Sequence, residues 1–223
     1  MDLPGHGSRG SDDIRRITRE YYVEAVVTPA QLNRLSHLTL VVHSFAATLV
    51  PQLVERLGDA LERIVFIGGV LPPSGKLPIS ALSASQRLRA RLFKASEHGI
   101  GVPGSLGKGV PVRKGNPDLV PEPYLPWMEP ADPARFPASI SLDYIVLTRD
   151  RVVSPKLQRG YAQALPSAQV LELEAGNQAP LTHQVEIVDV LLSGVPPRPP
   201  EEETAPEEES VAEKEAVAEG TNE

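Results

Sequence analysis

Short apolar runs alternate with helical stripes along most of the chain. Apolar runs at 38–42, 64–67 and 144–147, with an apolar-rich segment at 168–173, predict strands buried within a sheet. Between and around these runs, apolar residues recur at helical spacing and predict helices at 14–28, 45–57, 155–165 and 183–192. The order strand, helix, strand, helix predicts an α/β fold with a parallel sheet and right-handed crossovers. Pro29 is expected to kink or restart the first helix.

The run at 38–42 is interrupted by a single polar pair, His43 and Ser44. A helical stripe follows at once and ends near Gly58. A strand that turns sharply into a helix can hold a serine hydroxyl at the carboxyl end of the sheet. Active sites of α/β proteins lie at that end.

The segment 76–137 is less regular than the rest. A helix is predicted at 85–96, whereas 99–120 is rich in Gly and Pro and 121–127 is typical of stiff, extended chain. An inserted cap over an active site would explain this composition. A disordered insertion explains it equally well, so both interpretations stay open.

Composition indicates one domain at 1–194 and a disordered tail at 195–223. The tail carries ten acidic and two basic residues, so the rest of the chain, with 19 acidic and 20 basic residues, is close to neutral. The charge therefore gives no indication of a nucleic-acid surface. Cysteine is absent, which excludes disulfides and thiolate chemistry. Without a membrane-length apolar run or a signal-like start, a cytoplasmic protein without membrane association is expected.

The stretch from Val42 to Ala46 resembles the nucleophile elbow of the α/β-hydrolases, although Val42 and Ala46 replace the two glycines of the Gly-x-Ser-x-Gly pattern. The opening stretch Asp2-Leu3-Pro4-Gly5-His6-Gly7 resembles a segment of the methylesterase and hydroxynitrile-lyase branch. In that branch the segment follows a central strand and a loop that supplies an oxyanion donor. The resemblance thus implies an α/β-hydrolase fold that lacks its first strands, either through truncation or through a start assigned too late.

The resemblance also implies a catalytic triad in the chain order Ser, Asp, His. Ser44 takes the position of the nucleophile, and His43 matches a family histidine that is not the base. Asp150, after the strand at 144–147, takes the position of the acid, although a turn aspartate would have the same pattern. Asn177 stands where the family has its histidine, and an amide cannot accept the serine proton. His183, six residues on, is the alternative base and is expected to point elsewhere.

Three functional hypotheses follow. The first is a degenerate hydrolase of the small carboxyl-ester lineage, with activity lost or strongly impaired and a pocket for small ester-like or apolar molecules. The second is an active carboxylesterase or methylesterase that uses Ser44 with an unconventional base, and the third is a truncated product without a role. No cofactor is expected. Without a neighbouring strand, the run at 38–42 would form an exposed sheet edge through which the chain forms a homodimer or binds a partner.

Overall fold

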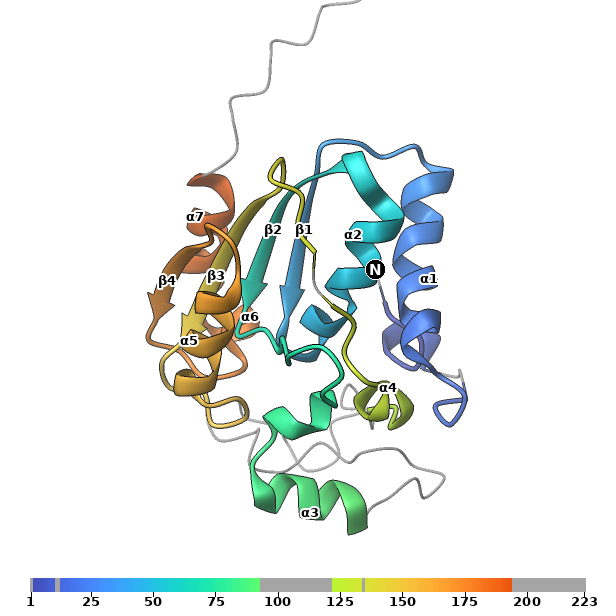
Figure 1. Cartoon of the computed structure of the whole chain (residues 1–223), viewed down its shortest axis with the longest axis vertical. Helices are drawn as coiled ribbons and strands as arrows, with labels where there is room; N and C mark the ends of the chain where they lie inside the picture. The colour runs from blue at the N-terminus through green and yellow to red at the C-terminus, as the bar shows by residue number, and fades with distance from the viewer. Residues whose placement is uncertain (1, 11–12, 93–121, 134, 194–223) are drawn as a thin grey trace, which may run out of the picture.

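A parallel sheet is the centre of the molecule (Figure 1). The computed structural model describes residues 2–10, 13–92, 122–133 and 135–193. Within them, four strands lie in the order β1-β2-β3-β4, and every neighbouring pair is parallel. They are β1 Leu38–His43, β2 Leu61–Ile67, β3 Ser141–Leu147 and β4 Gln169–Leu173. The predicted strands and the predicted α/β class are confirmed.

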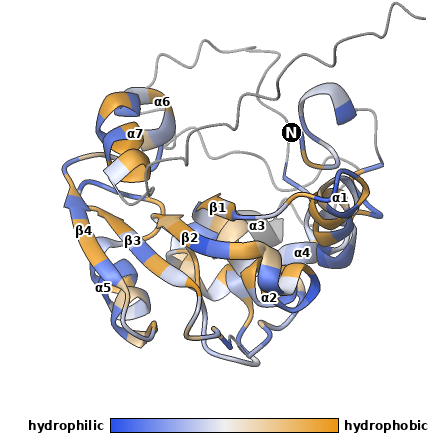
Figure 2. Cartoon of the chain, turned by 90° about the horizontal axis from the view of Figure 1, so that it is seen from above, coloured by the Kyte–Doolittle hydropathy of each residue, from blue (hydrophilic) through white to orange (hydrophobic). Residues whose placement is uncertain are grey.

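Helices cover both faces of the sheet (Figure 2). On one face lie α2 (Val50–Leu57) and α5 (Pro155–Ala164), with α1 (Arg19–Leu32) packed against α2. On the other face lie α6 (Ala179–Thr182) and α7 (Gln184–Ser193). The described chain also contains four short 3-10 helices: η1 Gly7–Arg9, η2 Ser44–Leu49, η3 Gly58–Ala60 and η4 Pro78–Ala81.

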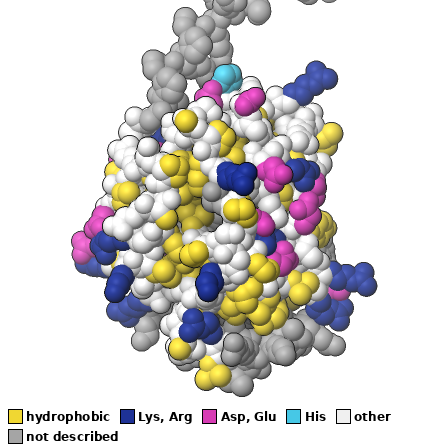
Figure 3. Space-filling model, in the orientation of Figure 1, with side chains coloured by type: hydrophobic (Ala, Val, Ile, Leu, Met, Phe, Trp, Pro, Cys, Tyr) yellow, Lys and Arg dark blue, Asp and Glu magenta, His cyan; other side chains and the backbone are white. Residues whose placement is uncertain are grey.

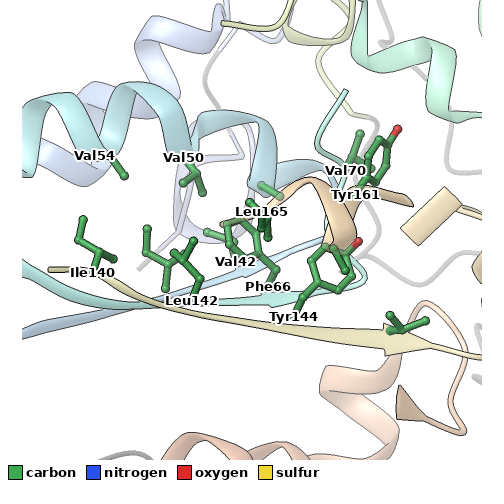
Figure 4. Close-up of a cluster of buried hydrophobic side chains, with 14 of the residues drawn as sticks. Val42, Val50, Val54, Phe66, Val70, Ile140, Leu142, Tyr144, Tyr161 and Leu165 are labelled. Carbon is green, nitrogen blue, oxygen red and sulfur yellow. The ribbon is translucent and has the colours of Figure 1, made fainter. Parts of the chain in front are cut away.

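The larger core lies between the sheet and the layer of α2 and α5 (Figure 4). Val50 from α2 and Tyr161 from α5 approach Val42, Phe66 and Tyr144 of three neighbouring strands. Phe66 and Tyr144 stack with their ring centroids 5.9 Å apart. This core fixes the two helices that flank the carboxyl ends of β1 and β3, where the candidate site lies.

The first helix differs from its prediction. It begins at Arg19, after Thr18 caps it by accepting a hydrogen bond from the Tyr21 backbone N–H, and it continues through Pro29 to Leu32. A proline inside a helix removes one backbone hydrogen bond, but the packing of Tyr22, Val23 and Val27 on α2 holds the helix together. Tertiary contacts thus override the local break.

Two further segments differ from expectation. The helix after Ser44 starts as η2 and becomes α-helical only at Val50, because Pro51 is well suited to the first turn of an α-helix and not to its interior. The segment expected to be extended at 121–127 contains the short helix α4 (Leu125–Met128). The helix predicted at 85–96 appears as α3 (Ala84–Leu92), and the stretch at 99–120 lies outside the described residues.

On the second face, Arg63 of β2 connects the sheet to α7. Its guanidinium is paired with Asp143 of β3 at 2.7 Å and donates hydrogen bonds to the carbonyl oxygens of Val190 and Leu191 in the last turn of α7. A cation at the carboxyl end of a helix satisfies unpaired carbonyls and favours the helix dipole. In the described part of the chain, no helix is long and apolar enough to cross a membrane.

Candidate active site

Ser44 lies directly after β1 in a strained backbone conformation. Its φ is 52°, a left-handed value that is unusual for a residue other than glycine. Its carbonyl oxygen accepts a hydrogen bond from the Val70 backbone N–H at 2.9 Å, which ties the turn to the end of β2. A serine on a sharp strand-to-helix turn at the carboxyl end of a parallel sheet has the local geometry of a nucleophile elbow.

The turn accommodates Val42 and Ala46 without glycines. Val42 is buried in the core beside Phe66. The turn packs tightly against Gly69, two residues after β2, where an added Cβ atom would lie 2.9 Å from the Cβ of Ala47. The glycine after β2 therefore allows the tight packing around the serine turn.

Asp150 follows β3 and is almost fully buried. One carboxylate oxygen accepts the backbone N–H groups of Val152 and Val153, at 2.7 and 3.2 Å. The other accepts the side-chain amides of Gln158 and Asn177, at 2.9 and 3.2 Å. Burial raises the pKa of Asp150 above its usual value, and these hydrogen bonds oppose the shift.

Asn177 lies between the other two predicted residues. Its Nδ2 is 3.2 Å from Asp150 Oδ2 and 3.5 Å from Ser44 Oγ. An ionised carboxylate only accepts hydrogen bonds, so the amide must turn its NH₂ group toward Asp150. The same nitrogen then faces Ser44 as a donor. The fold thus brings Ser44, Asn177 and Asp150 together in one row.

His43 holds the main chain of Asn177 in place. Its Nε2 is 2.7 Å from the carbonyl oxygen of Asn177. Because a carbonyl only accepts, Nε2 carries the proton and donates it. Burial lowers the pKa of the His43 imidazole, so the neutral form is favoured.

The other described histidines make their hydrogen bonds away from Ser44. His183 lies just before α7, where its Nδ1 is 2.7 Å from Thr182 Oγ1. His6 contacts Pro4 and Glu122, and His37 contacts Glu62. In the described ranges, none of these rings is hydrogen-bonded to Ser44, and no group of three or more His, Cys, Asp or Glu residues is placed to hold a metal ion.

Gln158 is a site residue that the sequence reasoning missed. Its side chain is completely buried. The amide nitrogen donates to Asp150 and to the Val153 carbonyl, while the oxygen accepts the Leu147 backbone N–H at 2.8 Å. Its signal in the sequence is a polar residue on the inward stripe of α5, one turn before Tyr161.

A parallel sheet with helices on both faces and a strained serine between strand and helix defines an α/β protein of the hydrolase type. The family described as "Alpha/beta hydrolase family" matches residues 1–190. The chain therefore belongs to the alpha/beta hydrolase family, which confirms the superfamily resemblance.

Solved structures show the same fold at low sequence identity. An extracellular alpha/beta-hydrolase from a Paenibacillus species, described as sharing structural and functional homology with tobacco salicylic acid binding protein 2, is 19% identical, with a TM-score of 0.70 over 86% of this chain and 85% of that one. A pyrethroid hydrolase from Sphingobium faniae JZ-2 is 15% identical, with a TM-score of 0.66 over 86% and 83%. A thermophilic esterase from Thermogutta terrifontis is also 15% identical, with a TM-score of 0.60 over 86% and 76%. The comparison with curated proteins gives no match.

Proposed function

We propose that this chain is a small-molecule-binding member of the carboxyl-ester hydrolase lineage whose serine-hydrolase activity is strongly impaired. The observation that carries the proposal is the Asn177 amide nitrogen between Ser44 Oγ and Asp150 Oδ2. Acyl transfer requires a base that accepts the serine proton, and an amide nitrogen has no lone pair available for this purpose. Ser44 then keeps its proton and is a poor nucleophile.

The fall in kcat expected without a base is large, which supports strong impairment and not a modest loss of activity. Removal of the histidine base from a serine protease lowers kcat by about 2 × 10⁶. We propose the Phe45 backbone N–H, in the first turn of η2, as one donor to the oxyanion. Without a base, oxyanion stabilisation and substrate binding leave an acceleration of about 10³–10⁴ over water, far below that of an intact serine hydrolase.

The lineage is inferred from two features. The opening segment resembles the methylesterase and hydroxynitrile-lyase branch, and two of the similar structures are described as an esterase and a pyrethroid hydrolase. We infer that the ancestral substrates were small carboxylic esters, methyl esters among them. Phe45, which stacks on Trp127 with ring centroids 4.4 Å apart, offers an apolar surface next to Ser44 for such a molecule.

A fluorophosphonate probe tests the proposal, because it labels serines that are activated by a base. We expect no labelling of the wild type at Ser44 and clear labelling of Asn177→His. The Ser44→Ala/Asn177→His double variant is the matched control and should stay unlabelled. Labelling of the wild type that disappears in Ser44→Ala would contradict the proposal.

One observation favours the second hypothesis, an active carboxylesterase. The left-handed backbone of Ser44 costs about 1–3 kcal/mol, and such strain is common where a side chain has a catalytic role. Labelling of the wild type in the same experiment would support this function. It would require a base other than the histidines described above.

A further inference from the structure

The hydroxyl of Ser44 has the opposite hydrogen-bond role to that of an activated serine. In a catalytic triad the serine hydroxyl donates its proton toward the base. Here the facing group is the Asn177 amide nitrogen, which only donates, so Ser44 Oγ is the acceptor of this 3.5 Å contact. Among the described residues, Ser44 Oγ makes no second hydrogen bond. The proton of Ser44 therefore has no acceptor in the described part of the chain and is available to a ligand.

Asp150 fixes the orientation of the Asn177 amide. Its carboxylate accepts four hydrogen bonds, two from backbone N–H groups and two from the side-chain amides of Gln158 and Asn177. Four donors around one carboxyl group suit its ionised form, which only accepts. A flipped Asn177 amide would place its oxygen against Asp150 Oδ2, 3.2 Å away. The amide therefore keeps its donor side toward Ser44 as well.

A second donor lies beside the hydroxyl. The helix η2 begins at Ser44, so the Phe45 backbone N–H belongs to its first turn, where N–H groups have no partner within the helix. Ser44, Phe45 and Asn177 are each partly exposed, whereas Asp150 is buried. Two neighbouring donors select a ligand atom that only accepts hydrogen bonds. A carbonyl oxygen is such an atom.

Charge at the site favours an uncharged ligand. Among the described residues, no arginine or lysine forms an ion pair with Asp150. Arg149 is paired with Glu174, and the side chain of Arg151 is exposed. A carboxylate bound at Ser44 would therefore be repelled by Asp150 without a cation to offset the repulsion. On the face of the molecule shown in Figure 3, acidic and basic side chains are interspersed and form no broad field of one sign that would attract an anion.

We propose that Ser44 is the hydrogen-bond donor of a site that binds an uncharged carbonyl compound, an ester or a ketone, and holds it intact. This inference rests on the proposed function, because it requires that Ser44 keeps its proton. The Ser44 hydroxyl and the Phe45 N–H donate to the carbonyl oxygen. The stacked rings of Phe45 and Trp127 provide an apolar aromatic surface for the rest of the ligand. The serine thus recognises the carbonyl group and does not attack it.

Titration of the full chain with acetophenone, followed by NMR, tests this proposal. A ketone cannot be hydrolysed, so its binding is measured independently of any activity. The comparison ligand is α-methylstyrene, which has the same shape but a CH₂ group in place of the carbonyl oxygen. We expect saturable binding of acetophenone that is about tenfold tighter than that of α-methylstyrene, as a single hydrogen bond would give.

Two serine variants locate the donor. Ser44→Ala should abolish the preference for the ketone, while α-methylstyrene binds as before. Ser167→Ala is the matched control, because Ser167 has the same left-handed φ of 52° but lies before β4, at the other end of the sheet, and it should keep the preference. If Ser44→Ala does not fold, Ser44→Gly replaces it, since glycine suits this backbone conformation and also lacks the hydroxyl.

Asn177→His provides the reciprocal test. Its imidazole gives the Ser44 proton an acceptor within the protein, so the preference for acetophenone should fall in this variant, in which labelling by a fluorophosphonate appears. An undiminished preference in an Asn177→His variant that is labelled would contradict the assigned role of the hydroxyl.

Three further results would overturn the inference. They are the absence of saturable acetophenone binding up to its solubility limit, equal affinity for the two ligands, and an unchanged preference in the Ser44 variant. If the wild type is not labelled by the fluorophosphonate, these results leave the proposed function intact and remove this inference alone. Labelling of the wild type at Ser44 would remove both.

Discussion

On the β3–β4 side of the sheet, Asp150 receives four hydrogen bonds, whereas on the β1 side the hydroxyl of Ser44 has one long contact with a donor. The two edge strands of the sheet, β1 and β4, also differ in the charge that they carry. β4 carries Glu172, which is paired with Arg159, while β1 has no charged side chain from Leu38 to His43 and leaves Val41 43% exposed. The half that holds Asp150, the proposed acid, is fully hydrogen-bonded. The half that carries Ser44, the proposed nucleophile, has no proton acceptor beside the hydroxyl, and among the described residues the outer edge of β1 has no strand paired with it. The following experiments test this contrast.

The largest effect is expected from restoring a base between the two halves. In Asn177→His, one ring nitrogen would face Asp150 and the other Ser44, as the contacts of the amide already do. A positioned general base contributes about 10²–10⁴-fold, and we expect p-nitrophenyl acetate hydrolysis to rise by that factor. The increase should be lost when Ser44→Ala is added. An unchanged rate in a folded Asn177→His variant would mean that oxyanion stabilisation is missing as well.

The complete half should be sensitive to the loss of its buried ion pair. Arg63→Met leaves Asp143 buried without its partner and removes two hydrogen bonds to the end of α7. Breaking a buried pair costs about 3–5 kcal/mol, and urea denaturation should show a loss of this size. Arg159→Met breaks the exposed pair with Glu172 and should cost much less, because solvent screens this pair. Equal losses in the two variants would show that burial of the Arg63 pair is not the decisive factor.

The contrast also explains what the sequence could predict. Buried parallel strands and a serine between a strand and a helix leave local patterns in the sequence. The four strands could therefore be predicted from apolar runs, and the candidate positions Ser44, Asp150 and Asn177 from strand ends and from the family resemblance. The partners of Arg63 could not be predicted, because Arg63 contacts Asp143 and Leu191 across 80 and 128 positions. A pocket lined by Thr48, Leu71, Ala131 and Tyr161 is formed by four separate segments, so no local sequence pattern predicts it.

The open edge predicts an association of moderate strength. We expect the chain to self-associate through β1 with increasing concentration, because a strand with unpaired backbone groups can pair with another chain. Val41→Lys puts a charge on this edge and should shift size-exclusion chromatography toward the monomer. Gln169→Lys, on the opposite edge, is the matched control and should leave the elution unchanged. A wild type that stays monomeric at all concentrations would count against this use of β1.

The smallest effect is expected at His43, which joins the two halves through the Asn177 carbonyl. Burial lowers the pKa of its imidazole below the usual 6.5, although the nearby carboxylate of Asp150 opposes the shift. Below pH 6.5 the unfolded chain therefore takes up a proton more readily than the folded chain, and stability is lost as the pH falls through that value toward the lower pKa of the folded state. His43→Gln keeps a donor for the carbonyl and does not titrate. The difference between the unfolding free energies of wild type and His43→Gln should therefore shift against the wild type between about pH 7.5 and about pH 5.5, and a constant difference would show that His43 is not held in its neutral form.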